Sequence, residues 1–208
     1  MSSVEPGSRA EHMLNRAKEL ILRPDETWDV IDGEEATIEG LYRGWVLPLA
    51  AVPAICSALG HLAFGRFQIF GVRFHPSVIG IATQAATSYA LTLVGVYVMA
   101  LVVDELALRF GGERSRTQAF KLSAYSASVG WLGGIFLLLP TPGGVLAVLA
   151  GLYGLYVFYK GLPKLMRSDP EQTLTYFALT LLVLIGLTVL FGILTSCVGS
   201  WGGPVSIY

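Results

Sequence analysis

Five long stretches of apolar residues occupy the chain from Gly44 onward, at about residues 44–65, 77–103, 119–139, 142–162 and 174–197. The segment 174–208 contains no charged residue at all, and a soluble fold could not leave such a tail in water. A helix of about 20 apolar residues crosses a hydrocarbon core of about 30 Å. Continuously apolar stretches favour helices over a β-barrel, because backbone amides in a bilayer need internal partners. The sequence therefore predicts an all-α fold, an integral membrane bundle of five transmembrane helices.

Charged residues make up only 14% of the 208 residues, and they concentrate in the first 43. A soluble domain typically carries about 25%. Because this first segment is polar and acidic, we expect no cleavable signal peptide, and the first span would direct insertion. The sequence thus divides into a cytoplasmic N-terminal segment, 1–43, and a membrane domain, 44–208. The net charge of −1 offers no basic face for nucleic acid.

The basic residues are distributed unevenly between the two sides that five spans would create. Twelve of the 14 Lys and Arg residues fall in the segments on one side, and two fall on the other. Because cytoplasmic segments carry the excess of Lys and Arg, this division predicts a cytoplasmic N-terminus and an external C-terminus at Tyr208.

A helical stripe of apolar residues precedes the first span. Within residues 9–23, apolar side chains recur at helical spacing at Met13, Leu14, Ala17, Leu20 and Ile21. Pro24 would stop or kink this helix. Three roles remain open for the stripe: docking on the cytoplasmic ends of the spans, lying flat on lipid, or binding a partner.

A few polar residues fall within the predicted spans, where an ionisable group costs about 2.5–3.5 kcal/mol on insertion scales. Asp104 closes the second span and Lys121 opens the third, so an ion pair between these antiparallel neighbours is natural. The alternatives are snorkelling to headgroups and a substrate or proton site. The Gln84 amide needs a partner across helices, or water. The candidate ion pair or polar path between spans two and three comprises Gln84, Tyr89, Asp104, Lys121, Ser123 and Tyr125.

Motifs for catalysis and metal binding are absent from the sequence. It contains no Gly-x-Ser-x-Gly elbow, no His-Glu-x-x-His and no phosphate-binding loop. His12 has no second ligand at metal spacing. We therefore expect no enzymatic activity, no cofactor and no metal site. Small residues four apart, such as Gly130 and Gly134, predict close helix packing within the chain or a homo-oligomer face.

The stretch GLYGLYVFYKGLPKLMR, residues 151–167, is similar to the fourth-span signature of the Yip family of Ypt/Rab-interacting proteins, in its bacterial branch. Supporting segments are 47–53, 103–112 and 118–126, and the resemblance extends from about Leu14 to Phe191. The signature residues are Gly151, Tyr153, Tyr156, Tyr159, Gly161 and Leu162.

The resemblance implies five helical spans with a cytoplasmic N-terminus, in a bacterial inner membrane. Eukaryotic relatives are implicated in vesicle trafficking through small GTPases and in membrane shaping. Bacteria lack that machinery and the N-terminal segment is short here, so we expect no GTPase partner. The expected function is a non-enzymatic bundle that organises membrane or interacts with lipids or partners. The alternative is a small transporter, channel or lipid scramblase.

Overall fold

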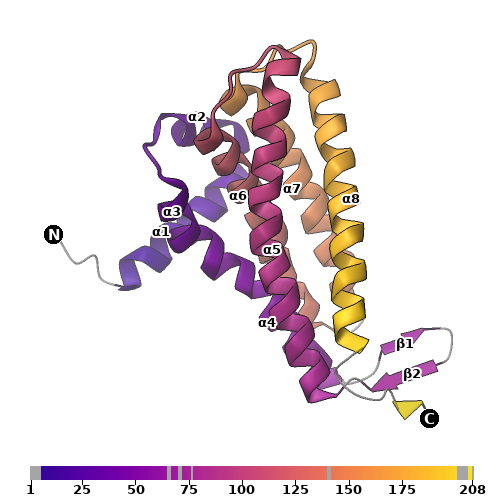
Figure 1. The fold of residues 1–208 in the computed structure, drawn as a ribbon. Helices are drawn as coiled ribbons and strands as arrows, with labels where there is room; N and C mark the ends of the chain where they lie inside the picture. Colours follow the sequence, from indigo (N-terminus) through magenta and orange to yellow (C-terminus); the bar gives the residue numbers. More distant parts are fainter. Residues whose placement is uncertain are drawn as a thin grey trace.

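The computed structural model describes residues 6–64, 67–69, 72–75, 77–139, 142–200 and 206–207, and the side chains of 11–64, 77–139 and 142–197. Most of this is helix (Figure 1). The α-helices are α1 (Pro6–Leu22), α2 (Pro24–Gly33), α3 (Ile38–Leu41), α4 (Leu47–Phe64), α5 (Val78–Ala107), α6 (Arg116–Gly133), α7 (Pro142–Met166) and α8 (Thr173–Ser200). The shorter helical turns are η1 (Tyr42–Val46), η2 (Leu108–Phe110) and η3 (Gly134–Leu138). A small antiparallel sheet has the order β1 (Phe67–Ile69), β2 (Val72–His75) and β3 (Ser206–Ile207).

Four helical segments in the described part of the chain are long and apolar enough to cross a membrane. They are Ile38–Phe64, Val78–Phe110, Pro142–Met166 and Thr173–Cys197. The prediction of five spans is therefore confirmed only in part. The predicted third span, 119–139, forms α6 and the 3₁₀ turn η3 instead of one long apolar helix. The physical reason is burial: a helix surrounded by protein need not be apolar on every face.

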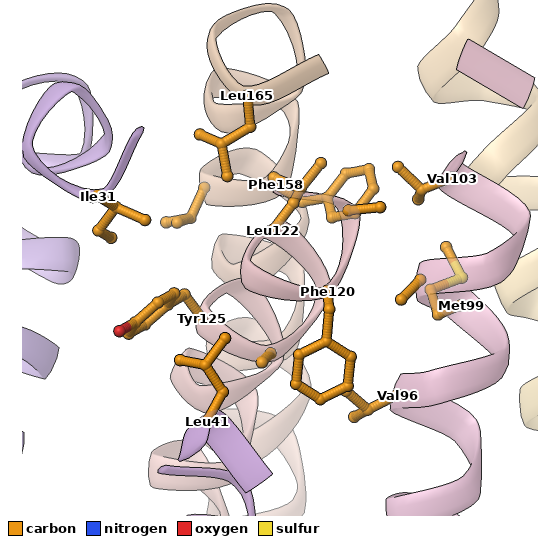
Figure 2. Packing of buried hydrophobic residues seen from close by; sticks show 14 of the residues in the cluster. Ile31, Leu41, Val96, Met99, Val103, Phe120, Leu122, Tyr125, Phe158 and Leu165 are labelled. Carbon is orange, nitrogen blue, oxygen red and sulfur yellow. The ribbon is translucent and has the colours of Figure 1, made fainter. Parts of the chain in front are cut away.

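Helix α6 occupies the centre of the bundle and packs against α4, α5 and α7. Figure 2 shows its side chains between those of neighbouring elements, with Ile31 from α2 on one side and Val96, Met99 and Val103 from α5 on the other. Phe120 and Leu122 of α6 are fully buried. The core is therefore built around α6, and the lipid-facing surface is left to the other helices.

The N-terminal segment docks on α6 and α7. Ala17 and Leu20 of α1 are buried, and the indole Nε1 of Trp28 donates a hydrogen bond of 3.0 Å to the Val157 carbonyl oxygen. Leu14 in the same stripe stays 62% exposed. Of the three roles left open by the sequence, docking on the bundle accounts for the buried side of α1, which carries Ala17 and Leu20. The sequence period alone did not separate this side from the exposed one.

Small residues bring helices close together within this one chain. A Cβ added at Gly134 would lie 2.7 Å from the Pro53 Cα, and one at Gly133 would lie 2.2 Å from the Ala150 Cβ. These positions let the end of α6 and η3 approach α4 and α7 more closely than a side chain would permit. Intramolecular packing therefore accounts for Gly134, whereas a homo-oligomer face stays a prediction.

The two ends of the bundle differ in chemistry. The α5–α6 and α7–α8 loops lie together with α2 at one end, at the top of Figure 1, and the small sheet lies at the other. We call the first the charged end, defined by Arg114, Arg116, Lys164 and Arg167. Its loops are joined by a hydrogen bond of 2.8 Å from the Glu113 amide to the Met166 carbonyl. The side of the membrane on which each end of the chain lies stays a prediction.

Candidate functional site

The two ionisable residues predicted to pair lie at the charged end but bind other partners. Asp104, 2% exposed, accepts from Arg114 Nε at 3.2 Å, and its Oδ2 lies 3.7 Å from Arg116 Nε. The predicted Asp104–Lys121 ion pair is therefore wrong. The α5–α6 loop folds back along α5 and brings two arginines to this carboxylate, which the spacing of the spans could not reveal.

Lys121 binds the N-terminal segment instead. Its ammonium group donates hydrogen bonds to the carbonyl oxygens of Ile31, at 2.9 Å, and Glu34. One turn earlier on α6, the side-chain amide of Gln118 donates to Asp32 Oδ1 at 2.9 Å. These carbonyls lie at the C-terminal end of α2, where the helix dipole favours a cation. Lys121 therefore caps α2 and holds it on the bundle.

The remaining residues of the predicted polar path do not converge. Gln84 is exposed on the surface of α5. The Tyr89 hydroxyl donates to the Leu47 carbonyl at 3.1 Å. Tyr125 lies between two indoles, with ring centroids 6.3 Å from Trp28 and 4.7 Å from Trp45. In the described structure these side chains join neighbouring helices and form no continuous path with Asp104 and Lys121.

The family-signature residues on α7 divide between two tasks. On one face, the Tyr153 hydroxyl donates to the Ile21 carbonyl at 2.6 Å, and Gly161 makes room for Trp28. On another face, Tyr159 packs edge-on against Phe177 of α8, with centroids 5.3 Å apart. Leu162 is fully buried. The Lys160 ammonium nitrogen lies 5.9 Å from the centroid of the Tyr156 ring. Gly151 lines a cavity.

That cavity has a volume of about 320 Å³ and lies between α5, α6, α7 and α8. Three of its lining residues, Val96 and Met99 of α5 and Phe158 of α7, are labelled in Figure 2. Its lining on α8 is an apolar stripe at helical spacing: Phe177, Thr180, Leu181, Leu184, Leu187, Thr188 and Phe191. From Phe177 to Phe191 this stripe is about 20 Å long, at 1.5 Å per residue. We call the cavity with this stripe the groove.

The groove is open between α7 and α8. These helices meet at the charged end, where Phe177 contacts Phe158 and Tyr159, but α8 packs mainly along α5 elsewhere. Leu155 on α7 and Leu184 on α8 line the groove and remain half-exposed. The opening therefore faces the apolar surroundings of the bundle.

Two hydroxyl groups lie in the wall of the groove without a partner. Ser123 and Ser126 are each 4% exposed, and neither Oγ has a hydrogen bond in the described structure. By contrast, Thr180 and Thr92 line the same groove and each donates to its own helix, to the Tyr176 and Ser88 carbonyls at 2.8 Å.

Ser123 is among the residues predicted from the sequence, whereas the groove is not. Its one available signal was the charge-free α8, whose stripe of Phe, Leu and Thr recurs every three or four residues. Among the described residues, no three His, Cys, Asp or Glu side chains come together to hold a metal ion.

A family model described as Yip1 domain matches residues 18–193, a range that contains every residue lining the groove. The chain is 29% identical over 185 residues to a protein of Escherichia coli K12 named inner membrane protein YohC, covering 88% of this chain and 94% of the relative. The protein of that name from E. coli O6:H1, strain CFT073, matches with the same identity and coverage. No solved structure gave a significant match.

Proposed function

This chain belongs to the Yip1 domain family of multi-pass membrane proteins, and we propose that it is a non-enzymatic bundle that takes the acyl chain of a bilayer lipid into the groove between α5, α6, α7 and α8. The observation that carries the proposal is an apolar groove of about 320 Å³ that opens between two membrane-spanning helices.

The lining of the groove supports an acyl chain as its occupant. An empty groove would forfeit the dispersion contacts that a close-packed interior makes. A water molecule needs two to four polar partners, whereas this lining is mostly leucine, phenylalanine and glycine. Hydrocarbon surrounds a membrane-spanning helix, so lipid acyl chains are the molecules that can enter a groove open to that side. An extended chain also fits the shape of a stripe about 20 Å long.

The alternative of a transporter or channel has no observation in its favour. Its proposed path required polar side chains in register across two helices, yet Gln84 faces outward and Lys121 is engaged by the carbonyls of α2. Binding and organisation of lipid needs no such path. We therefore carry forward the lipid-binding function alone.

The experiment uses protein in bilayers that contain a lipid with a photoreactive diazirine near the end of its acyl chain. Illumination followed by peptide mass spectrometry is expected to place crosslinks on groove residues of α6 and α7, such as Ala127 and Leu155. Leu184→Trp fills the groove and should remove these crosslinks. Leu182→Trp makes the same change at a position 67% exposed and should leave them. Wild-type crosslinks confined to exposed helix faces would refute the proposal.

A further inference from the structure

We infer that one side of α1, formed by Leu14, Ile21 and Leu22, is in contact with the acyl chains of the bilayer. We call these three residues the outer flank. Helix α1 then has three sides, one packed on the bundle, one in lipid and one in water. The inference is independent of the groove, because no residue of α1 lines it.

The side chains of α1 fall into three sets according to their positions around the helix. Ala17 and Leu20 are buried against the bundle. Leu14, Ile21 and Leu22 follow the spacing i, i+7 and i+8, which places them on one side of a helix, and they are 62%, 37% and 66% exposed. The third set is polar and lines a cleft of about 520 Å³ between α1 and α2: His12, Asn15, Arg16 and Glu19. Because no residue of the outer flank lines this cleft, the flank faces away from it.

The attachment of α1 to α7 brings the outer flank beside a membrane-spanning helix. The Tyr153 hydroxyl of α7 donates to the Ile21 carbonyl at 2.6 Å. Helix α2 binds α7 nearer the charged end, at the Val157 carbonyl and at Lys164. Tyr153 lies 13 residues before Met166, the last residue of α7, which is about 20 Å at 1.5 Å per residue. The C-terminal end of α1 therefore lies further along the span than α2 does, and Figure 1 shows α1 below α2.

This position makes the bilayer the partner of the outer flank. Lipid surrounds α7 as a membrane-spanning helix, so exposed side chains attached to the middle of α7 meet acyl chains before any other molecule. Three aliphatic side chains gathered on one side of a helix are typical of a helix that lies in the membrane interface. Lys18 lies between Leu14 and Leu22 in the sequence, and its stem is long enough for the ammonium group to reach the headgroups. Glu19 lines the polar cleft instead and stays in water.

The test attaches a nitroxide spin label to single cysteines in the full-length chain in liposomes, with Cys56 and Cys197 replaced by alanine. Leu14→Cys and Leu22→Cys place the label on the outer flank, and Asn15→Cys and Glu19→Cys are matched controls on the cleft side. All four positions are exposed, so the label does not disturb the core. Oxygen concentrates in hydrocarbon, whereas a nickel chelate stays in water. Oxygen should therefore collide more often with the two flank labels, and the nickel chelate more often with the two controls.

Each alternative partner gives a different result. If the nickel chelate reaches the flank labels as readily as the controls, the flank lies in water and the inference is overturned. If the flank is protected only at high protein density and becomes accessible on dilution with further lipid, a second copy of the chain covers it, which also refutes lipid contact. Concentrated salt should leave the flank labels protected, because apolar burial does not depend on charge screening. Release by salt would assign the contact to headgroup charge and overturn the inference.

Discussion

Replacing Gly161 by alanine is expected to loosen the N-terminal helices from the bundle. A Cβ at this position would lie 2.5 Å from Trp28 Cε2 and 2.7 Å from Leu122 Cδ1, and both side chains are fully buried. Overpacking of a tight core costs about 1–3 kcal/mol, and contact with two buried groups places this change in the upper half of the range. Alanine recovers about 1 kcal/mol of helix propensity. The net destabilisation of the docked state is therefore about 1–2 kcal/mol.

Hydrogen exchange of α2 followed by mass spectrometry measures this loss directly. A change of about 1–2 kcal/mol in the opening free energy speeds exchange of residues 24–33 by about fivefold to thirtyfold. Gly186→Ala is the control, because a Cβ there meets nothing within 4 Å and the change in propensity is the same. Unchanged exchange in Gly161→Ala, or an equal increase in the control, would refute the assignment of this glycine to Trp28 docking.

The remaining predictions concern the capping lysine and the topology. Lys121→Met keeps the length of the side chain but removes the donor from two carbonyls of α2, and should lower stability by about 1–3 kcal/mol in thermal unfolding; Lys18→Met at an exposed position should not, and equal melting temperatures would contradict the capping role. Reporters fused before Met1 and after Tyr208 should report opposite sides of the membrane, with the first in the cytoplasm; the same side for both would overturn the topology.

Hydropathy predicted the long lipid-facing helices well, because hydrocarbon around a helix favours apolar residues along its whole length. The predicted spans 142–162 and 174–197 correspond to α7 and α8, whose observed bounds are Pro142–Met166 and Thr173–Ser200. The span predicted at 119–139 is confirmed only as helix, in α6 and η3, because the neighbours of α6 are protein. A helix enclosed by other helices can carry serines and a lysine, and its hydropathy then says little about where it lies.

The partners of single polar residues could not be predicted from the chain order of the spans. The order of the spans predicts Asp104 as one possible partner of Lys121, but its acceptors are about 90 residues away on α2. The groove escaped prediction for a related reason. The groove lies where α8 packs along α5 and separates from α7. This separation depends on how the helices pack together, and no single sequence pattern predicts it.

The docking of α2 has a consequence for how the protein is made. Trp28 and its neighbour Asp29 find their partners in Val157 and Lys164, which a ribosome synthesises more than 120 residues later. The contacts of α2 with α7 can therefore form only after α7 has been synthesised, later than its contacts with Lys121 of α6. Until then the indole Nε1 of Trp28 lacks its acceptor, so α2 can complete its docking only after the span Pro142–Met166 has been made.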